Sequence, residues 1–286
     1  MTDGLVVVDK GAGWTSHDVV AKLRGVLHTK KVGHSGTLDP DATGVLLIGV
    51  GRVTRLLRFL TALPKTYTGE VVLGVSTSTL DASGEVTARH HMSVTLDEVR
   101  AAAATLTGNI LQVPPMVSAV QIGGKRLHEL ARAGIEVERE ARPVTVHRFD
   151  VDATDDPLVY RIEVECSSGT YIRSLAEDVG VALGGGGHLR NLRRTAIGSF
   201  TLAEARTIEA IAASEDQAIL PPASALRDYP NVTASRELLG SGKVLERSEL
   251  GVDGDGPWAV LDEDGRLLAM YEPHRGDTVK PAVVIA

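Results

Sequence analysis

The chain has 286 residues, of which 43% are hydrophobic and 23% are charged, with 30 glycines and 12 prolines. This composition is typical of a globular protein and excludes collagen-like, coiled-coil and wholly disordered chains. The formal net charge of −7 excludes a protein that coats nucleic acid through bulk positive charge, because such binding needs many unopposed Lys and Arg side chains.

Membrane and disulfide classes are excluded by other features. The longest strongly apolar stretch, residues 45–50, is far shorter than the roughly 20 residues that span a bilayer, and the N-terminus lacks the basic start of a signal peptide. We therefore expect a cytoplasmic protein that contacts no membrane. The single cysteine, Cys166, forms no internal disulfide, and no Cys/His cluster has the spacing of zinc ligands, so the sequence predicts no metal site.

The first part of the chain predicts strands and helices in alternation. In chain order we expect a strand at 5–8, a helix capped by Thr15 or Ser16, a Gly- and Asp-rich loop at 33–44, a strand at 45–50, a helix over about 52–63 and a strand at 66–75. Thr95, followed three residues later by Glu98, is a capping box that predicts an Ala-rich helix ending before Gly108.

The following part predicts an excursion from the core and then one strand and one helix. Residues 113–143 combine Pro and Gly punctuation with one short helix and several basic side chains. Residues 161–166 alternate in polarity, which predicts a strand with Cys166 in the core, and the pattern is helical over 170–183. The four glycines at 184–187 lack the Lys-Ser/Thr ending of a phosphate loop, so we interpret them as a flexible helix exit.

Charge is distributed unevenly along the chain. Residues 230–286 hold ten acidic and six basic side chains, and their short apolar runs between Asp/Gly turns predict a compact β-rich domain. Two basic runs contain no acid, at 22–31 and 188–194. Each run alone is more typical of a solvated surface than of a binding patch, so the runs indicate nucleic-acid binding only if a site lies between them.

The most informative segment is GHSGTLDPDATGVLLIGVG, residues 33–51. Pro40 forces Asp39 onto an extended or turn backbone, and the glycines around it allow a ligand to approach closely. For an arbitrary Asp-Pro in such a loop, capping a turn is the commoner role. The segment, however, resembles the signature of the pseudouridine synthases, and specifically of the bacterial tRNA pseudouridine-55 synthase family, TruB, in which the Asp of a GxLDPxATG loop is the nucleophile.

Other segments resemble the same family in the family's order, and with the loop they cover most of residues 5–200. They are LVVVDKGAGWTSHDVVAKLR, KTYTGEVVLGVSTSTLDASGE, VPPMVSAVQIGGKRLHELARAGIEV, and SSGTYIRSLAEDVG with LRNLRRTAIGSF. The family usually has Lys-Pro where this chain has Lys10-Gly11. Residues 230–286 match the family's RNA-binding PUA domain only loosely.

The resemblance implies an α+β fold with a mixed, largely antiparallel central sheet flanked by helices. We expect a catalytic domain at 1–228, with 113–143 as its RNA-clasping insertion, and a small PUA-like β domain at 229–286. The implied reaction breaks the N1–C1′ bond of uridine, rotates the uracil and forms a C5–C1′ bond. No oxidation state changes, so no cofactor, metal or nucleotide is expected.

The resemblance also assigns the catalytic residues. Asp39 would be the nucleophile, and Arg173 would be its charge partner, which keeps the carboxylate ionised and oriented. Tyr67 would pack its ring on the flipped base and help to move the C5 proton. Without the family motifs, Arg173 would be interpreted as a surface helix arginine and Tyr67 as a core residue.

Five further residues would contact the substrate. Tyr171 and Leu192 would wall the uracil pocket, and His34 would occupy the space that the extruded base leaves. Lys10 would support the loop or a phosphate, and Asp81 would contact the substrate. For Lys10 and Asp81 a purely structural role is an equal alternative.

The implied partner is tRNA, which a monomer would bind at the T-stem-loop with the target uridine flipped out. The basic side chains expected to contact the RNA are Lys22, Lys30, Lys31, Lys125, Arg126, Arg132, Arg190, Arg193 and Arg194. Two alternatives stay open. A nucleosidase or glycosidase with Asp39 and Asp81 as paired carboxylates would release free base, and a non-catalytic RNA-binding protein of the same fold would leave uridine unchanged.

Overall fold

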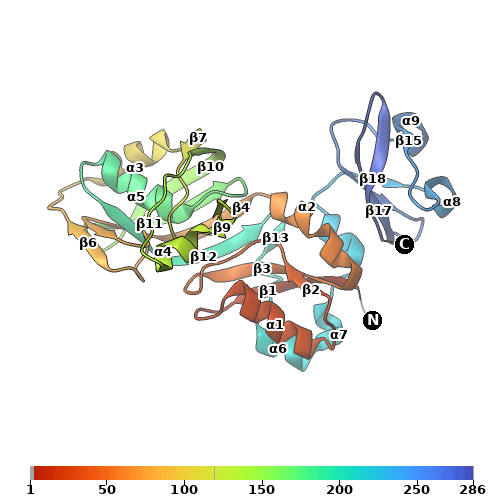
Figure 1. Cartoon of the computed structure of the whole chain (residues 1–286), viewed down its shortest axis with the longest axis horizontal. Helices are drawn as coiled ribbons and strands as arrows, with labels where there is room; N and C mark the ends of the chain where they lie inside the picture. Colours follow the sequence, from red (N-terminus) through yellow and green to blue (C-terminus); the bar gives the residue numbers. More distant parts are fainter. Residues whose placement is uncertain (1–2, 119, 286) are drawn as a thin grey trace. The chain divides into compact units, whose positions relative to one another are not determined.

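A computed structural model describes residues 3–118 and 120–285. By internal contacts the chain divides into two compact units, and Figure 1 labels most of their helices and strands. Unit 1 comprises Met1–Pro40, Gly44–Leu63 and Ile197–Ala286, and unit 2 comprises Asp41–Thr43 and Pro64–Ala196. Within the described residues, no helix is both long and apolar enough to cross a membrane.

Unit 1 is built on β1 (Gly4–Lys10), which pairs antiparallel with β3 (Thr43–Val50), and on β2 (Val32–His34), which also pairs antiparallel with β3. Side chains alternate across these strands. Val6 and Ile48 pack in one cluster with α1 (Ser16–Val26) and α6 (Ile208–Ala213). Val7 and Leu47 pack in another with η1 (Gly51–Leu56), α2 (Leu57–Ala62) and η2 (Pro222–Leu226). Both faces are therefore buried, which explains the unbroken apolar run at 45–50.

Unit 1 also contains the predicted β-rich tail. Its strand order is β14-β16-β17-β18-β15. The bounds are Asn231–Thr233 for β14, Leu245–Glu246 for β15, Trp258–Leu261 for β16, Leu267–Pro273 for β17 and Thr278–Val284 for β18. Trp258 and Tyr271 pack in a cluster with α8 (Arg236–Leu239) and α9 (Arg247–Leu250). Met270 instead joins the cluster of Val7 and Leu47.

The tail is also tied to the rest of unit 1 by arginines. Arg55 of η1 donates to the Val284 carbonyl at 2.7 Å, and Arg58 of α2 pairs with Glu272 at 3.0 Å. Residues 231–285 therefore share a core with the N-terminal strands. The expected functional boundary near residue 228 stays a prediction.

Unit 2 carries a sheet with the strand order β12-β4-β11-β10-β7. The bounds are Lys65–Leu73 for β4, Gly108–Gln112 for β7, Arg142–Ala153 for β10, Val159–Cys166 for β11 and Gly187–Ile197 for β12. The pairs β4–β11, β11–β10 and β10–β7 are antiparallel. The basic run at 188–194 forms much of β12, which the sequence did not predict because its arginines interrupt the apolar alternation.

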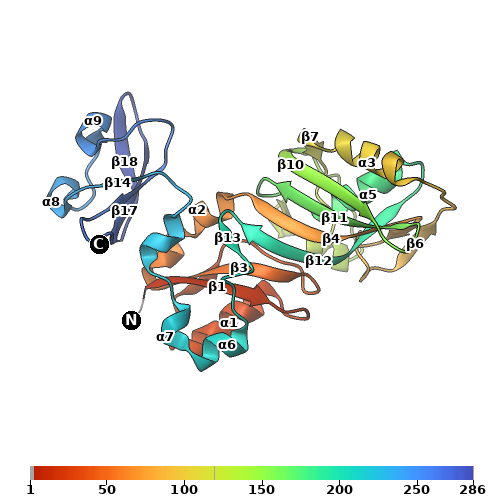
Figure 2. The same cartoon turned by 180° about the vertical axis from the view of Figure 1, so that it is seen from behind.

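Two helices cover one face of this sheet, as Figure 2 shows from behind. They are α3 (Leu96–Thr105) and α5 (Ile172–Ala182), and Val99 and Leu175 pack with Ile162 of β11. Thr95 and Glu98 form the predicted capping box at the start of α3. Helices on a largely antiparallel sheet confirm the predicted α+β class.

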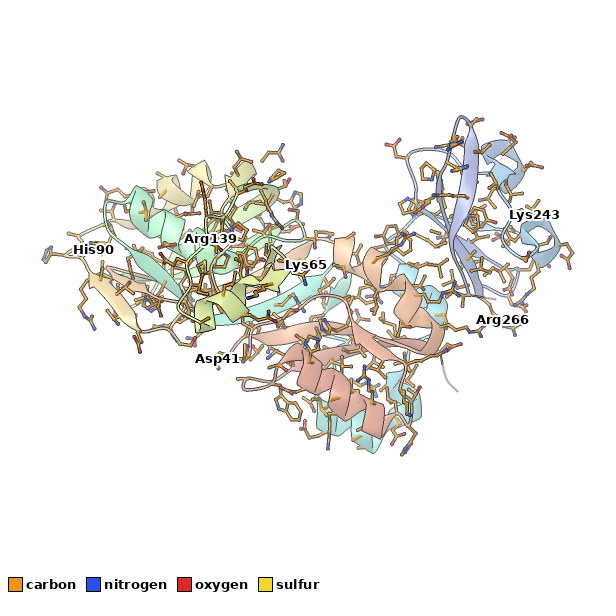
Figure 3. All side chains as sticks on the ribbon, viewed as in Figure 1. Asp41, Lys65, His90, Arg139, Lys243 and Arg266 are labelled. Carbon is orange, nitrogen blue, oxygen red and sulfur yellow. The ribbon has the colours of Figure 1, made fainter. Side chains whose placement is uncertain are left out.

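A hairpin of β5 (Val75–Thr77) and β6 (Val86–Arg89) extends from unit 2, and His90 after it points outward in Figure 3. The glycine run at 184–187 packs against the base of this hairpin. The Gly74 N–H donates to the Gly186 carbonyl at 2.8 Å, and a Cβ on Gly186 would lie 2.0 Å from Ser76 Oγ. The glycines follow the C-terminus of α5, as expected. They allow close packing of the backbone and not the flexibility that the sequence predicted.

Candidate active site

Asp39 lies on a loop of unit 1 whose backbone is fixed on both sides. Before it, the Leu38 N–H donates to Ser16 Oγ at 2.9 Å, and Ser16 is the buried first residue of α1. After it, the Pro40 carbonyl accepts from Lys10 Nζ at 3.0 Å and from the Gly13 N–H at 2.9 Å. The Asp39 side chain is half-buried. Its carboxylate is therefore carried by a backbone with little freedom to move.

Lys10 is 0% exposed, and its side chain supports this loop. Nζ donates to the carbonyls of Gly11 at 3.0 Å, Trp14 at 2.7 Å and Pro40 at 3.0 Å. An ammonium group has three donors, and each of them has a carbonyl here. Of the two expected roles, loop support is the one that this geometry favours, because a fully buried side chain offers no surface to a phosphate.

His34 ends β2 at the start of the Asp39 loop and is half-buried. Its Nδ1 accepts from the Gly36 N–H at 3.2 Å, which assigns the proton of a neutral ring to Nε2. Its ring meets His17 edge to face, with 5.2 Å between the centroids. These contacts hold the imidazole in one orientation, and its role toward the substrate stays a prediction.

In unit 2, Arg173 lies in the first turn of α5 and is 5% exposed. Its Nη1 donates to the Thr79 carbonyl at 2.9 Å and its Nη2 to the Val117 carbonyl at 2.8 Å. Its Nε lies 3.7 Å from Asp81 Oδ2. The guanidinium is therefore a fixed, buried charge, unlike the solvated helix arginine that the residue type alone predicts.

Asp81 lies at the centre of a polar turn. Its Oδ1 accepts from the Thr79 hydroxyl at 2.6 Å, the Ser83 hydroxyl at 2.6 Å and the Ser83 N–H at 3.1 Å. These three bonds all go to Oδ1, and the other carboxylate oxygen, Oδ2, is the one that lies near Arg173. The contact with Arg173 fits the structural alternative for Asp81, and the expected substrate contact stays a prediction. Thr79 and Ser83 were missed, although short polar residues two positions either side of an Asp are typical of such turns.

The remaining site residues of unit 2 are partly exposed at the margin of its core. Tyr67 lies on β4 and Leu192 on β12, and both pack against the main cluster of the unit. Tyr171 is the N-cap residue of α5 and is half-buried. Partly exposed aromatic and aliphatic side chains are suited to wall a ligand pocket, so these assignments stay predictions.

Two buried basic side chains lie near Tyr67 in the sheet. Lys65, at the start of β4, is 5% exposed, and Arg194 on β12 is 1% exposed. Burial, together with repulsion from Arg194, lowers the pKa of Lys65 to about 8. The expected phosphate contact of Arg194 does not fit this burial. Cys166 pairs with Lys65 across β11 and β4, and burial raises the pKa of its thiol to about 11, as for the expected core cysteine.

The other basic residues differ in their exposure. Lys22, Lys30, Lys31 and Lys125 are exposed. Arg190 pairs with Glu70 at 2.5 Å, and the half-buried Arg193 donates to Thr43 Oγ1 at 3.1 Å. The side chains of Arg126 and Arg132 lie outside the described residues. In the part of the chain that the structure describes, no group of three or more His, Cys, Asp or Glu side chains could hold a metal ion.

Comparison with known proteins identifies the family. Residues 24–172 match the family model for the N-terminal domain of TruB family pseudouridylate synthases. The chain belongs to the TruB family. Residues 173–228 of this TruB chain match the C-terminal domain of tRNA pseudouridylate synthase B. The predicted family and enzyme class are confirmed, whereas the PUA-like interpretation of 229–286 stays a prediction because both matches end before these residues.

Curated relatives match the TruB chain over almost its full length. The tRNA pseudouridine synthase B of Arthrobacter sp. (strain FB24) is 46% identical, with 100% of this chain and 97% of the relative covered. That of Streptomyces coelicolor is 48% identical, with 98% of this chain and 97% of the relative covered. A chain in the crystal structure of a Cbf5-Nop10-Gar1 complex superposes with a TM-score of 0.78 at 26% identity, covering 99% of this chain and 85% of that one.

Proposed function

We propose that this TruB-family enzyme isomerises uridine 55 in the T-loop of tRNA to pseudouridine, acting as a monomer in the cytoplasm. Asp39 is the nucleophile, and the target uridine is flipped out of the folded loop. The observation that carries the proposal is the fixation of the Asp39 loop by Ser16 before it and Lys10 after it. A carboxylate that must meet one atom of a nucleoside gains most from such preorganisation.

The chemistry needs only groups that this chain supplies. The Asp39 carboxylate adds to the nucleoside, either at the base or at C1′ of the sugar, and the N1–C1′ bond breaks. The uracil turns, C5 bonds to C1′, the carboxylate is released, C5 loses its proton and N1 gains one. Tyr67 is proposed to stack on the uracil and to help move the C5 proton. The product has the mass of the substrate.

RNA binding is proposed to use the exposed lysines. Lys22, Lys30 and Lys31 in unit 1, and Lys125 in the insertion of unit 2, are exposed and contact phosphates in this proposal. The net charge of −7 limits unspecific binding to other RNA. The acidic PUA-like tail, residues 229–286, adds shape recognition rather than phosphate affinity.

The test incubates the protein with unmodified tRNA, without metal or nucleotide, and analyses the digested nucleosides. Isomerisation leaves the RNA mass unchanged and makes uridine 55 reactive to carbodiimide. A nucleosidase instead releases uracil and leaves an abasic site, and a non-catalytic binder leaves the uridine as it was. A tRNA with cytidine at position 55 is the substrate control, because conversion elsewhere in it would refute the assigned position.

Asp39→Asn separates chemistry from recognition. The amide has nearly the size of the carboxylate but is a far poorer nucleophile, so this variant is expected to bind tRNA and convert none of it. Asp41→Asn is the matched control, because Asp41 is an exposed carboxylate on the same loop, labelled in Figure 3. Pseudouridine made by Asp39→Asn beyond wild-type contamination would overturn the nucleophile assignment.

A further inference from the structure

The root of the 113–143 insertion is bonded to the first turn of α5. Gln112, the last residue of β7, donates through Nε2 to the Tyr171 carbonyl at 3.1 Å and accepts the Tyr171 N–H at Oε1 at 2.7 Å. Ser174 Oγ donates to the Val113 carbonyl at 3.3 Å, and Arg173 donates to the Val117 carbonyl. Residues 112–117 are thus hydrogen-bonded to three of the four residues 171–174.

The paired bonds of Gln112 are the ones that depend on a particular side chain. Gln112 is 3% exposed, so its amide has little access to water that could replace a lost partner. A primary amide carries a donor and an acceptor side by side, which matches the N–H and C=O of one residue. A hydrocarbon side chain makes neither bond, and an ionised carboxylate makes only one.

The Tyr171 backbone links Gln112 to the first turn of α5. Tyr171 is the N-cap residue of α5, and its own side chain makes no capping hydrogen bond. Its carbonyl also accepts the Leu175 N–H at 3.2 Å and so belongs to the first turn of the helix. Because helical backbone is stiff, a shift of Tyr171 moves Arg173, whose guanidinium contacts Asp81.

We propose that Gln112 is a positioning residue for the isomerisation: its side-chain amide fixes the Tyr171 backbone and through it the Tyr171 ring and the Arg173 guanidinium. The effect on the reaction rate rests on the proposed function. The two hydrogen bonds between Gln112 and Tyr171 can be tested on the free protein without RNA.

The first experiment compares two amide-to-leucine variants on the same strand. Asn109, on β7, is exposed, and its Oδ1 accepts from Thr145 of β10 rather than from α5. Gln112→Leu is expected to lower the single-turnover rate of pseudouridine formation by about 10- to 100-fold, the size of effect that a misplaced group produces, while tRNA Kd changes less than about threefold. Asn109→Leu is expected to stay within about twofold in both.

The second variant, Gln112→Glu, gives a signature that a merely structural role would not. Its ionised carboxylate accepts the Tyr171 N–H but has no donor for the Tyr171 carbonyl, whereas the protonated acid has one. Burial raises the pKa of a carboxyl at this position. The rate of Gln112→Glu relative to the wild type is therefore expected to rise as the pH falls from 8 to 6, and that of Gln112→Leu is expected to stay flat.

The third measurement is amide hydrogen exchange of the free protein. Exchange at Tyr171 is expected to be at least tenfold faster in folded Gln112→Leu than in the wild type, with Asn109→Leu unchanged. If the wild type converts no uridine while Tyr171 exchange depends on Gln112, the proposed function fails and the fixation of Tyr171 stands. Wild-type rates in Gln112→Leu, equal losses in Asn109→Leu, or unchanged Tyr171 exchange would each overturn the proposal. If Gln112→Leu does not fold, Gln112→Glu carries the test.

Discussion

Replacing Lys10 by methionine tests whether the fixed loop matters for chemistry. Methionine fills a similar volume without the ammonium group, so Lys10→Met removes the bonds to the Gly11, Trp14 and Pro40 carbonyls. The Pro40 carbonyl keeps the Gly13 N–H as a partner, and Gly11 is exposed to water. The half-buried Trp14 carbonyl is therefore the acceptor that loses most.

The size of the effect follows from these partners. An interior carbonyl left unpaired costs about 1–3 kcal/mol, and bonds from a charged donor are among the stronger ones. Removing a buried charge returns part of this loss, because its desolvation is no longer required. We expect the free energy of unfolding to fall by about 2 kcal/mol. Because the loop that carries Asp39 loses an anchor, we expect the single-turnover rate to fall about 10- to 100-fold.

The assay combines urea unfolding with single-turnover conversion of tRNA and a measurement of tRNA Kd. Lys22→Met is the matched control for the unfolding measurement alone, because Lys22 is exposed on α1 and its loss should change the free energy of unfolding by less than about 0.5 kcal/mol. A destabilised Lys10→Met protein that still converts tRNA at the wild-type rate would refute the link between the loop and the chemistry. A loss confined to tRNA affinity would point instead to a phosphate contact.

Three further predictions concern stability. Burial, with repulsion from Glu177, raises the pKa of Asp178 from 3.8 to about 6. The ionised carboxylate therefore destabilises the folded protein at pH 7, and this destabilisation disappears once the pH falls below 3.8. Asp178 is only half-buried, so solvent screening reduces the effect. Asp178→Asn is expected to raise the free energy of unfolding by about 1–2 kcal/mol at pH 7 and by little at pH 4, measured with urea, and no gain at pH 7 would contradict it. Because the pKa of Lys65 is lowered from 10.5 to about 8, the unfolded chain binds more protons between these values, and wild-type stability should rise between pH 8 and 9 by up to about 1 kcal/mol. Lys65→Met should lack that rise, and the same slope in both proteins would exclude Lys65 as its cause. Deleting residues 230–286 removes part of a shared core, so it should lower the urea midpoint and expose a surface that binds an apolar dye, whereas an unchanged midpoint would show the tail to be independent.

Local sequence signals located the longer helices and strands β1, β3, β4 and β11, but not β7, β10 or β12. Thr95 is the N-cap of α3, as its capping box predicts, because that motif depends on residues three positions apart. Of the two expected caps of α1, Thr15 and Ser16, Thr15 is the N-cap. The apolar run at 45–50 predicted β3, and the helical pattern at 170–183 predicted α5. The family motifs around Asp39 supplied the reaction class, because the residues of that loop lie consecutively in the chain.

The tertiary structure alone decided what each side chain contacts. The burial of Lys10 against the Pro40 carbonyl, and the contact of Asp81 with Arg173, join residues that are far apart in the sequence. Arg194 was assigned to the RNA-binding surface from its charge, yet it lies inside the sheet. Composition and spacing indicate the capped helices and the buried apolar strands, because these depend on neighbours in the chain. Burial and hydrogen-bond partners depend on strand register and packing between distant segments, and these physical relations exist only in the folded protein.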